Sequence, residues 1–574
     1  EQLRDSTEYN SYSCAQRAVI KQALRDFRLS GVGLDEQAKT RYKTLASELS
    51  ALTSRFSQNV LDAGQAWSKR VTDEQSLAGL PKAALDLTAQ NAKRTGVSGW
   101  VLNLDYPVYS AVMSYAHNRD LREELYTAYT TRASDQGPNA GQWDNSDLIE
   151  DILAKRHELA NVVGFANYAE YSLARKMADS PAQVREFLDG LGRHSKPVAE
   201  AEYRELTDYA SAELKLSPLQ AWDVSYVSEH LRKARFDISP EELRPYFPMP
   251  GVLQGLFEIV RRLFSINVVA KTDVAVWDPS VQFFEIQTTA GDPIGQFYLD
   301  AYARTGKRGG AWMDECVVRR RTSSGVQLPV AYLNCNFSPP TPSRPSLLTH
   351  SEVLTLFHEF GHGLHHLLTR VDHGAVSGIN GVPWDAVELP SQFLENWCWV
   401  EEGLALISGH FESGDPLPDA LVGRLRNARN FLSGLAMVRQ LEFSLFDLRI
   451  HADYTPESPT PIGTTLAQVR NEICVVPTPQ FNRFSHAFTH IFAGGYAAGY
   501  YSYKWAEVLA ADAFGRFEEC GVFDQVSGEA FRDQVLARGG SEDAMELFRA
   551  FRGREPDVGA LLRQCGIDRT STSP

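Results

Sequence analysis

The sequence predicts a mainly α-helical protein with one small β-sheet, and three observations support this. Apolar residues recur at intervals of three and four through residues 1 to about 235, as they do on helices that bury one face. Between about 274 and 337, β-branched and aromatic residues replace that pattern, which is typical of strands. Helical spacing then returns at residue 348 and continues to about 453, so the sheet should lie between two helical regions.

The N-terminal part of the chain should form successive helices. Residues 41–62 and 146–163 show the clearest helical periodicity, with polar residues between the apolar ones. The stretch SDQGPNAGQWDN, directly before the second of these segments, contains several Gly and Asn residues. This composition predicts a loop that turns the chain.

A proline-rich connector ends the first helical region. Four prolines lie between residues 240 and 250, and a further helix is expected at about 252–264. We therefore expect two regions in the chain. Residues 1–250 form a mainly helical region, and residues 251–574 carry the sheet, the candidate site and the C-terminal helices.

The expected sheet lies directly before the most distinctive helix. Its candidate strands are rich in β-branched and aromatic residues, and turn residues such as those at 290–292 separate them. The four segments are VAVW at 274–277, VQFFEIQT at 281–288, GQFYLDAY at 295–302 and PVAYLNCNF at 329–337.

The helix expected after the sheet carries its own start signal. Thr349 can cap the helix and Glu352 follows three residues later, which is the capping-box pattern. Leu348 and Val353 occupy the two positions of a hydrophobic staple. We therefore expect the helix to begin at His350.

This helix contains the pattern H-E-x-x-H, formed by His358, Glu359 and His362. Residues four apart lie one turn above each other on a helix, so both imidazoles can reach one metal ion. Neutral imidazoles suit Zn²⁺, and an adjacent glutamate can take a proton from a water that attacks a carbonyl. Glu359 is therefore the candidate general base. The same pattern can arise by chance on an apolar helix, and His365 and His366 are expected either to support the ligands or to be structural, rather than to be ligands themselves.

A third ligand is expected on a second helix. The stretch WDAVELPSQFLENWCW follows a glycine-containing connection and brings Glu388 to where it can reach the same ion. Together with His358 and His362, it would form a His₂Glu zinc site with one position left for water. Gln392 or Glu395, one or two turns further along, could orient a ligand imidazole.

The segment HAFTHIFAGGYAAGYYSYKW also contains residues with candidate chemistry. Its glycines, among them Gly494 and Gly495, permit close approach of the backbone to a ligand. Tyr496, Tyr500 and Tyr503 would share one face if the segment were helical. A phenol hydroxyl can donate to the oxyanion that develops when a peptide carbonyl is attacked. Taken alone, a tyrosine stripe is more often a packing surface.

Two further C-terminal segments have clear patterns. Residues 454–465 contain three prolines and predict a surface loop. Residues 539–554 are charged and helical in pattern, and the final DRTSTSP is expected to be frayed. Arg552 and Arg554 could meet a carboxylate, and we give them no catalytic role.

Composition argues against several classes of protein. With 574 residues, 43% of them hydrophobic, the chain can bury a large core, and no run of about 18 apolar residues predicts a membrane span. A formal net charge of −15 argues against nucleic-acid binding, which needs clustered Lys and Arg. The seven cysteines lack C-x-x-C spacing. This favours a reducing compartment, either the cytoplasm or an organelle matrix after removal of a targeting segment. We expect a monomer.

Several segments also resemble a known family. FHEFGHGLHH, VELPSQFLENW and HIFAGGYAAGYYSY are similar to the thimet oligopeptidase family of zinc metallopeptidases. RASDQGPNAGQWDN, KRGGAWMDEC and RGGSEDAMELFRAFRGREP resemble it as well, so the similarity runs from about residue 132 to about 556. The resemblance implies a zincin-type metallopeptidase with two helical lobes around a deep channel, which would admit short unstructured peptides.

The resemblance also implies roles for the tyrosine segment. His490, Tyr496, Tyr500 and Tyr503 would lie along the substrate channel, and the glycines before Tyr496 would contact the substrate. Tyr503, or alternatively Tyr500, would stabilise the oxyanion. His490 would assist that stabilisation or position the substrate.

The implied activity is zinc-dependent hydrolysis of internal bonds in short peptides, with one Zn²⁺ per chain and a place in peptide turnover after proteolysis. A dipeptidyl carboxypeptidase, which shares these motifs, is the alternative. A non-catalytic zinc-containing peptide-binding protein is a third reading. In zinc peptidases an edge strand commonly pairs with the substrate main chain. PVAYLNCNF or the segment 309–312 could serve here, and simple sheet packing explains both equally well.

Relatives of this kind carry additional helical sequence before the region that matches Glu1. We therefore expect this chain to be a truncated or processed form, in which channel closure, stability and size selectivity are altered. None of these patterns encodes the cleavage-site preference or the physiological peptides.

Overall fold

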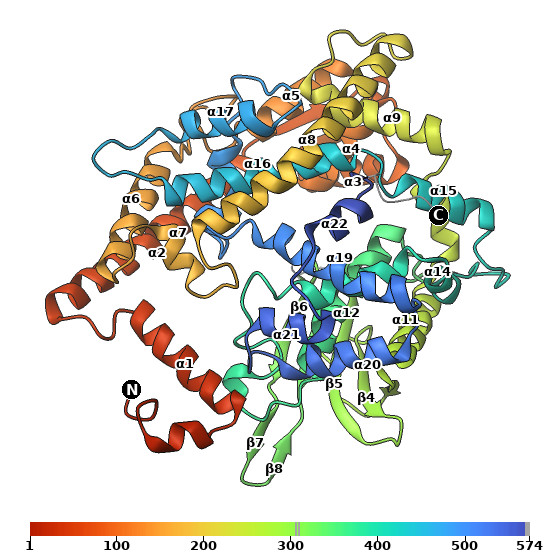
Figure 1. Cartoon of the computed structure of the whole chain (residues 1–574). Coiled ribbons are helices and arrows are strands. Elements are labelled where there is room, and N and C mark those ends of the chain that lie inside the picture. The colour runs from red at the N-terminus through yellow and green to blue at the C-terminus, as the bar shows by residue number, and fades with distance from the viewer. Residues whose placement is uncertain (305–306, 308–309, 342, 569–574) are drawn as a thin grey trace.

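Helices dominate the computed structural model, which describes residues 1–568 apart from 305–306, 308–309 and 342 (Figure 1). One five-stranded sheet and two small two-stranded sheets complete it. The mainly helical architecture with a small sheet is therefore confirmed. The expected fraying of DRTSTSP concerns residues that, after Asp568, lie outside the described part of the chain.

The first half of the chain forms successive helices, as expected. The loop predicted before α6 is present, and β1 and β2 form an antiparallel pair. The elements are α1 (Cys14–Leu29), α2 (Glu36–Gln65), β1 (Ser68–Val71), α3 (Lys82–Arg94), β2 (Trp100–Asn103), α4 (Tyr106–Tyr115), α5 (Arg119–Thr130), α6 (Ser146–Val162), α7 (Tyr168–Leu173), α8 (Pro181–Ala212), α9 (Val224–Phe236), α10 (Pro240–Leu243) and α11 (Met249–Phe264).

The main sheet has the strand order β3-β4-β5-β9-β6. Its pairs are antiparallel except β5 with β9, which run parallel. The strands are β3 (Ile266–Lys271), β4 (Gln282–Thr288), β5 (Pro293–Tyr302), β6 (Trp312–Val317) and β9 (Val330–Phe337), and β7 (Arg320–Thr322) pairs with β8 (Gly325–Gln327) in a hairpin.

Two expectations about the sheet are wrong. VAVW at 274–277 is not a strand, because Trp277 packs against Tyr298 with ring centroids 5.1 Å apart and donates from Nε1 to Asp300 at 3.0 Å. PVAYLNCNF cannot be a free edge, because β9 is paired on both sides, and the edge strands of this sheet are β3 and β6. Of the alternative segment 309–312, residue 309 lies outside the described residues.

Helices return after β9 and continue to the C-terminus. The loop expected at 454–465 is shorter than predicted, because α17 already begins at Ile462. The elements are α12 (His350–Leu367), α13 (Leu389–Leu394), α14 (Glu401–Ile407), α15 (Asp419–Ala428), α16 (Ser433–Ala452), α17 (Ile462–Ile473), α18 (Thr489–Phe492), α19 (Ser502–Cys520), α20 (Gln525–Gln534), α21 (Ala544–Arg552) and α22 (Val558–Gln564).

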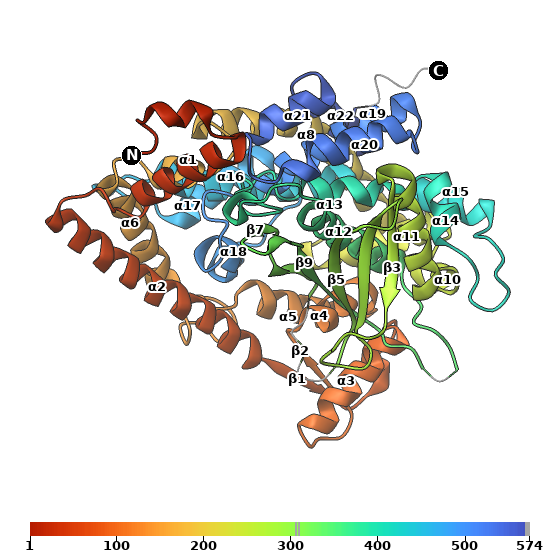
Figure 2. The same cartoon turned by 90° about the horizontal axis from the view of Figure 1, so that it is seen from below.

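The largest apolar core joins the two regions of the chain. It contains residues of α8, α11, the sheet, α12, α16 and α19, and α8 and α16 lie side by side (Figure 1). A separate apolar cluster holds β1, β2, α4 and α5 together, in the part of the molecule at the bottom of Figure 2. The division at residue 250 stays a prediction. Among the described residues, no helix combines the length and apolar character needed to cross a bilayer.

Candidate metal centre

Helix α12 begins where its sequence predicts. The Thr349 hydroxyl accepts from the Glu352 backbone N–H at 3.2 Å, and the Glu352 carboxylate accepts from the Thr349 N–H at 2.7 Å. This capping box satisfies backbone donors that the first turn leaves unpaired. Leu348 and Val353 are both buried, as a hydrophobic staple requires. The helix therefore starts in a fixed position between the sheet and the α13 segment.

Three predicted ligands converge on one point. The Nε2 atoms of His358 and His362 lie 3.2 and 3.1 Å from the same carboxylate oxygen of Glu388, Oε2. The three donor atoms all lie within 4.8 Å of one another. Two imidazole nitrogens and one carboxylate oxygen in this arrangement fit a single Zn²⁺ or a similar divalent ion.

Glu388 reaches the histidines because α13 approaches α12 closely at Gly361. A Cβ on Gly361 would lie 2.5 Å from Ser391 Cα and 2.6 Å from the Pro390 carbonyl oxygen, so a larger residue would push the helices apart. Ser391 also donates from Oγ to Glu388 Oε2 at 3.0 Å. The glycine of FHEFGHG thus has a packing role that sets the distance between the ligands.

Glu395, rather than Gln392, forms a hydrogen bond with one of the predicted ligand imidazoles. Its Oε1 accepts from His358 Nδ1 at 2.7 Å, which leaves the Nε2 lone pair of His358 free to face the metal position. The other candidate, Gln392, makes no such contact, and its Oε1 has no partner among the described residues. His366 donates from Nε2 to the Val317 carbonyl at 3.0 Å and His365 is buried, so both occupy structural positions.

Glu359 lies beside the three ligands and is only 6% exposed. Burial raises the pKa of its carboxyl group, while the two imidazoles and the Met313 backbone N–H on β6 act in the opposite direction. A carboxylate with a raised pKa holds a proton more readily than an exposed one. This is the property that a general base needs when it takes a proton and returns it.

The cluster is strongly attractive to cations. Burial opposes charge on His358, yet hydrogen bonds to Glu388 and Glu395 raise its pKa to about 10. Burial likewise opposes charge on Glu388, and the two imidazoles hold its pKa well below the usual range. Two carboxylates around a pair of imidazoles therefore stabilise positive charge at the point where the donors meet.

The tyrosine segment, defined here as residues 490–503, is not one helix. It turns irregularly between the end of α18 and the start of α19, so the expected single helical face does not form. Tyr496, Tyr500 and Tyr503 nevertheless converge. The rings of Tyr496 and Tyr503 stack with centroids 4.9 Å apart, and Tyr500 meets Tyr503 at 5.2 Å.

Tyr503 is better placed for chemistry than Tyr500. The Tyr500 side chain is buried and its hydroxyl lies 3.3 Å from Gln440 Oε1, to which it donates. Tyr503 is partly exposed, and Glu388 lies within its electrostatic reach. Burial, and then the neighbouring Tyr496 hydroxyl, raise the pKa of Tyr503, so it stays a protonated donor. Gly494 and Gly495 are exposed.

His490 lies at the other end of the same ring cluster. Its ring contacts those of Tyr496 and Tyr500 at 6.0 and 5.9 Å. Partial burial lowers the pKa of His490, which keeps the imidazole neutral near pH 7. A neutral imidazole can donate one hydrogen bond to a substrate without carrying a charge.

Sequence patterns did not reveal what holds this segment in place. The Asp447 carboxylate on α16 accepts from the backbone N–H groups of Ala498, Gly499 and Tyr500 at 2.8, 2.9 and 2.9 Å. Ser172 donates from Oγ to the Ala497 carbonyl at 2.8 Å. The backbone at the centre of the segment is therefore fixed by side chains from two other helices.

Asp385 links the same segment to the Glu388 stretch. Its carboxylate accepts from Tyr501 Oη at 2.7 Å and from the backbone N–H of Met177 at 2.7 Å. It lies three residues before Glu388. The signal for Asp447 was a single acid among apolar residues, as in FSLFDLRIH. A buried carboxylate of this kind must find several donors.

A family comparison settles the classification of this chain. The model of peptidase family M3 matches residues 112–567. The chain belongs to peptidase family M3. This M3 peptidase is thus a member of a metallopeptidase family, and the expected likeness to the thimet oligopeptidase family is confirmed.

Individual relatives agree with this assignment. The chain of this M3 peptidase is 54% identical over 566 residues to Oligopeptidase A of Escherichia coli (strain K12), covering 98% of this chain and 83% of that protein. It is 33% identical over 571 residues to the Dipeptidyl carboxypeptidase of the same strain, covering 99% and 82%. A solved structure of a putative peptidase from Chlamydophila abortus shares the fold, with a TM-score of 0.57 at 15% identity over 94% of this chain and 75% of that one.

Proposed function

We propose that this M3 peptidase is a zinc-dependent endopeptidase that hydrolyses internal bonds of short, unstructured peptides. The observation that carries the proposal is the convergence of His358, His362 and Glu388 beside the buried Glu359. Its higher identity to Oligopeptidase A than to Dipeptidyl carboxypeptidase supports internal cleavage. The expected channel between two helical lobes, which would exclude folded proteins, belongs to the same proposal.

The two histidines and Glu388 would hold one Zn²⁺, with Glu395 keeping the His358 ring in its orientation. The chemistry that such an ion supplies when bound is Lewis-acid polarisation of a carbonyl and acidification of a water. Glu359 takes a proton from the attacking water and delivers it to the leaving amine. Its buried position beside the imidazoles suits both steps.

Tyr503 donates its hydroxyl hydrogen bond to the oxygen on which negative charge develops. The stack with Tyr496 fixes the ring plane, and the neutral His490 offers a second donor further along the cluster. Tyr496, Tyr500 and the exposed Gly494 and Gly495 would line the path of the peptide. The segment needs to be held rigidly, because a donor that is displaced by 1 Å loses much of its effect.

The substrate main chain would pair with the outer edge of β6. Among the described strands, β6 has a neighbour on one side only, and its Met313 lies against Glu359. Pairing along this edge would set the scissile carbonyl beside the metal position by main-chain hydrogen bonds. This mode accepts many side chains, which fits peptide turnover after proteolysis.

The cysteines support a proposal for the cell compartment. All seven are free thiols, which fits a reducing environment, and we place the enzyme in the cytoplasm, with an organelle matrix as the alternative. We expect a monomer that acts on peptides rather than on nucleic acid or membranes.

A peptide library tests this proposal. Half of the peptides carry amidated C-termini, and products of the wild type and Glu359→Gln are identified by mass spectrometry after the metal content of both has been measured. We expect internal cuts, also in amidated peptides, by the wild type, and less than about 1% of that rate by the metal-loaded variant. Removal of C-terminal dipeptides from free-acid peptides only would show a dipeptidyl carboxypeptidase. Binding without cleavage by the metal-loaded wild type would show a non-catalytic protein.

A further inference from the structure

A cavity of about 730 Å³ begins at the ring cluster of the tyrosine segment. His490 and Tyr500 form its wall on that side, and α16 contributes Arg439 and Phe443. The rings of Tyr500 and Tyr503 meet at 5.2 Å, so the proposed catalytic tyrosine directly contacts a residue of the cavity wall. A peptide that lies along His490 and Tyr500 would therefore border this cavity.

The far wall of the cavity is aromatic. Tyr126 and Tyr129 of α5, Tyr109 of α4 and Phe484 surround the space with their rings. Tyr109 and Tyr129 stack with centroids 3.9 Å apart. Such a wall would bind the apolar part of a side chain.

Two guanidinium groups face this space. Arg439 packs over Phe443 with its charge centre 4.3 Å from the ring centroid, and Arg132 packs over Tyr129 at 3.7 Å. Arg132 donates from Nε to the Tyr129 carbonyl at 2.9 Å. It has no ion-pair partner within the described part of the chain. Its two terminal nitrogens are available to a ligand.

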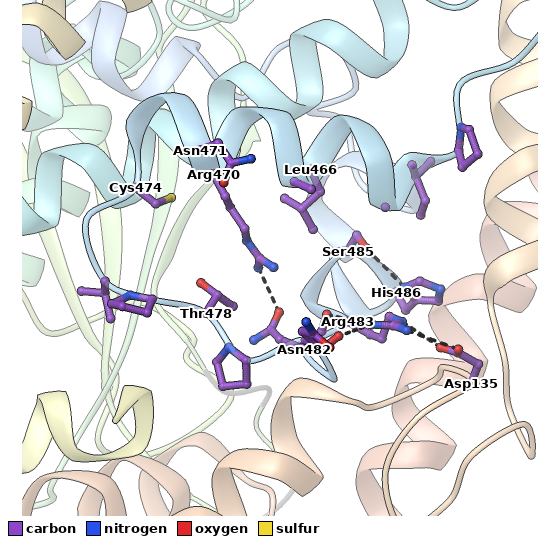
Figure 3. A pocket seen from close by; sticks show the side chains of 18 of the residues that line it. Asp135, Leu466, Arg470, Asn471, Cys474, Thr478, Asn482, Arg483, Ser485 and His486 are labelled. Carbon is purple, nitrogen blue, oxygen red and sulfur yellow. Dashed lines mark hydrogen bonds and ion pairs between the residues drawn. The ribbon is translucent and has the colours of Figure 1, made fainter. Parts of the chain in front are cut away.

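The one carboxylate in the wall does not cancel both charges. Glu442 is buried and accepts from Arg439 Nη1, but it also accepts from Arg470 Nε at 2.7 Å. Arg470 reaches Glu442 from a neighbouring cavity, which lies on the other side of residues 474–482. Figure 3 shows this cavity, with the Arg470 guanidinium directed at Asn482. Because Arg470 compensates the negative charge of Glu442, the positive charges of Arg439 and Arg132 are left over. They produce a net positive potential in the cavity.

A neutral donor completes the set. Tyr109 makes no hydrogen bond to any residue that the structure describes, although the charges of Arg132 and Arg439 both act on its hydroxyl. Burial raises its pKa, so the hydroxyl keeps its proton. Two guanidinium groups and one phenol in an aromatic pocket form the donor arrangement that recognises a carboxylate.

We propose that the Arg439 cavity, defined by Arg439, Arg132, Tyr109 and Tyr129, is a substrate subsite that binds a peptide carboxylate. The carboxylate belongs to an acidic side chain or to the C-terminus of the peptide, at a fixed distance from the scissile bond. This inference rests on the proposed peptidase function. The subsite would give the protein a preference for acidic rather than basic peptides, although the net charge of the whole chain is −15.

The test compares matched peptides. A neutral peptide with a single cleaved bond is made with Gln or Glu at each position in turn, in amidated and free-acid forms, and kcat/KM is measured for each. We expect the Glu form to exceed the Gln form about tenfold at one position, or the free acid to exceed the amide about tenfold. The first result assigns the subsite to a side chain and the second to the C-terminus. Ratios near one throughout would overturn the proposal.

Variants locate the effect. Arg439→Met and Arg132→Met should each reduce the preference about tenfold, and Tyr109→Phe about threefold. Arg262→Met is the matched control, because Arg262 is similarly exposed, pairs with Glu258 and stacks on Phe523 at 5.2 Å. It should leave the preference unchanged. A preference that survives both arginine substitutions of the cavity would contradict the assignment.

A binding measurement separates failure of the subsite from failure of the proposed function. The Kd of each Glu peptide is measured calorimetrically in a Glu359→Gln background, with and without Arg439→Met. A tenfold rise in Kd supports the subsite even when the wild type cleaves nothing. An unchanged Kd with a correctly folded variant overturns it even when the wild type is an active peptidase.

Discussion

The three hydrogen bonds to Asp447 make a quantitative prediction about the tyrosine segment. Asp447 is 1% exposed, and its two oxygens accept from three consecutive backbone N–H groups. The backbone carbonyl of Asp447 also accepts a hydrogen bond from His451 Nδ1 at 2.8 Å. The ring proton lies on Nδ1 because Arg156 donates to the other ring nitrogen, Nε2. Asp447→Asn keeps the size of the side chain and replaces one accepting oxygen by an NH₂ donor.

The magnitude follows from the bonds that change. At least one charge-assisted hydrogen bond, worth about 1.5–3 kcal/mol, is lost, and one buried N–H is left facing another donor at a cost of about 1–3 kcal/mol. The native conformation of residues 498–500 should therefore weaken by about 3–5 kcal/mol. If Tyr503 acts only from this conformation, kcat/KM falls by the same factor as the population of this conformation, at most about 100- to 1000-fold.

The assay combines kinetics, metal content and a control. Asp447→Asn should lose kcat while it retains bound metal, because Asp447 contacts none of the ligands, and limited proteolysis within residues 493–500 should accelerate. In a Tyr503→Phe background the same substitution should have a much smaller effect on kcat. Asp453→Asn, an exposed site on the following turn that pairs with Arg185, should change stability by less than about 1 kcal/mol. Wild-type kcat in a folded Asp447→Asn variant would refute the reasoning.

Three further predictions concern the ligands and their surroundings. Glu395→Gln removes the charge on the partner of His358 and should weaken zinc binding about 10- to 100-fold in a chelator competition, whereas an unchanged affinity would deny Glu395 this role. Gly361→Ala sets a Cβ against the Ser391 backbone and should lower Tm and activity together, by about 1–3 kcal/mol in stability. Burial lowers the pKa of Lys176 to about 8 from its ordinary 10.5. Between pH 8 and pH 10.5 the unfolded chain therefore binds more protons at Lys176 than the folded chain does. Wild-type stability relative to Lys176→Met should therefore rise from pH 8 to pH 10.5 in thermal unfolding, and a flat difference would contradict this.

Local signals in the sequence were sufficient to place the helix that carries the two predicted histidine ligands. Thr349 and Glu352 form the expected cap, so His350 begins α12 and the two histidines face the same side. Glu388 was predicted as the third ligand because the stretch WDAVELPSQFLENWCW was expected to bring it to the two histidines. The choice between Gln392 and Glu395 stayed open, because α13 ends at Leu394 and Glu395 lies in the tighter turn after it, where ideal helical spacing no longer holds.

Tertiary contacts decided what sequence patterns could not. The spacing of Tyr496, Tyr500 and Tyr503 suggested a helix, but Asp447 binds the backbone N–H groups there and holds an irregular turn instead. PVAYLNCNF has the composition of any buried strand, and nothing in it reveals that β6 would pair on its outer side. Both outcomes depend on residues far away in the sequence.

Metal titration of the chelator-treated protein tests the central claim most directly. Zn²⁺ is added stepwise while cleavage of one amidated peptide and bound metal are followed in the wild type, Glu359→Gln and Glu388→Ala. The account predicts that wild-type activity rises linearly and stops at one equivalent, that Glu359→Gln binds the same equivalent without activity, and that Glu388→Ala binds zinc far more weakly. Full activity before zinc is added, or a metal-loaded Glu359→Gln that cleaves at the wild-type rate, would contradict it.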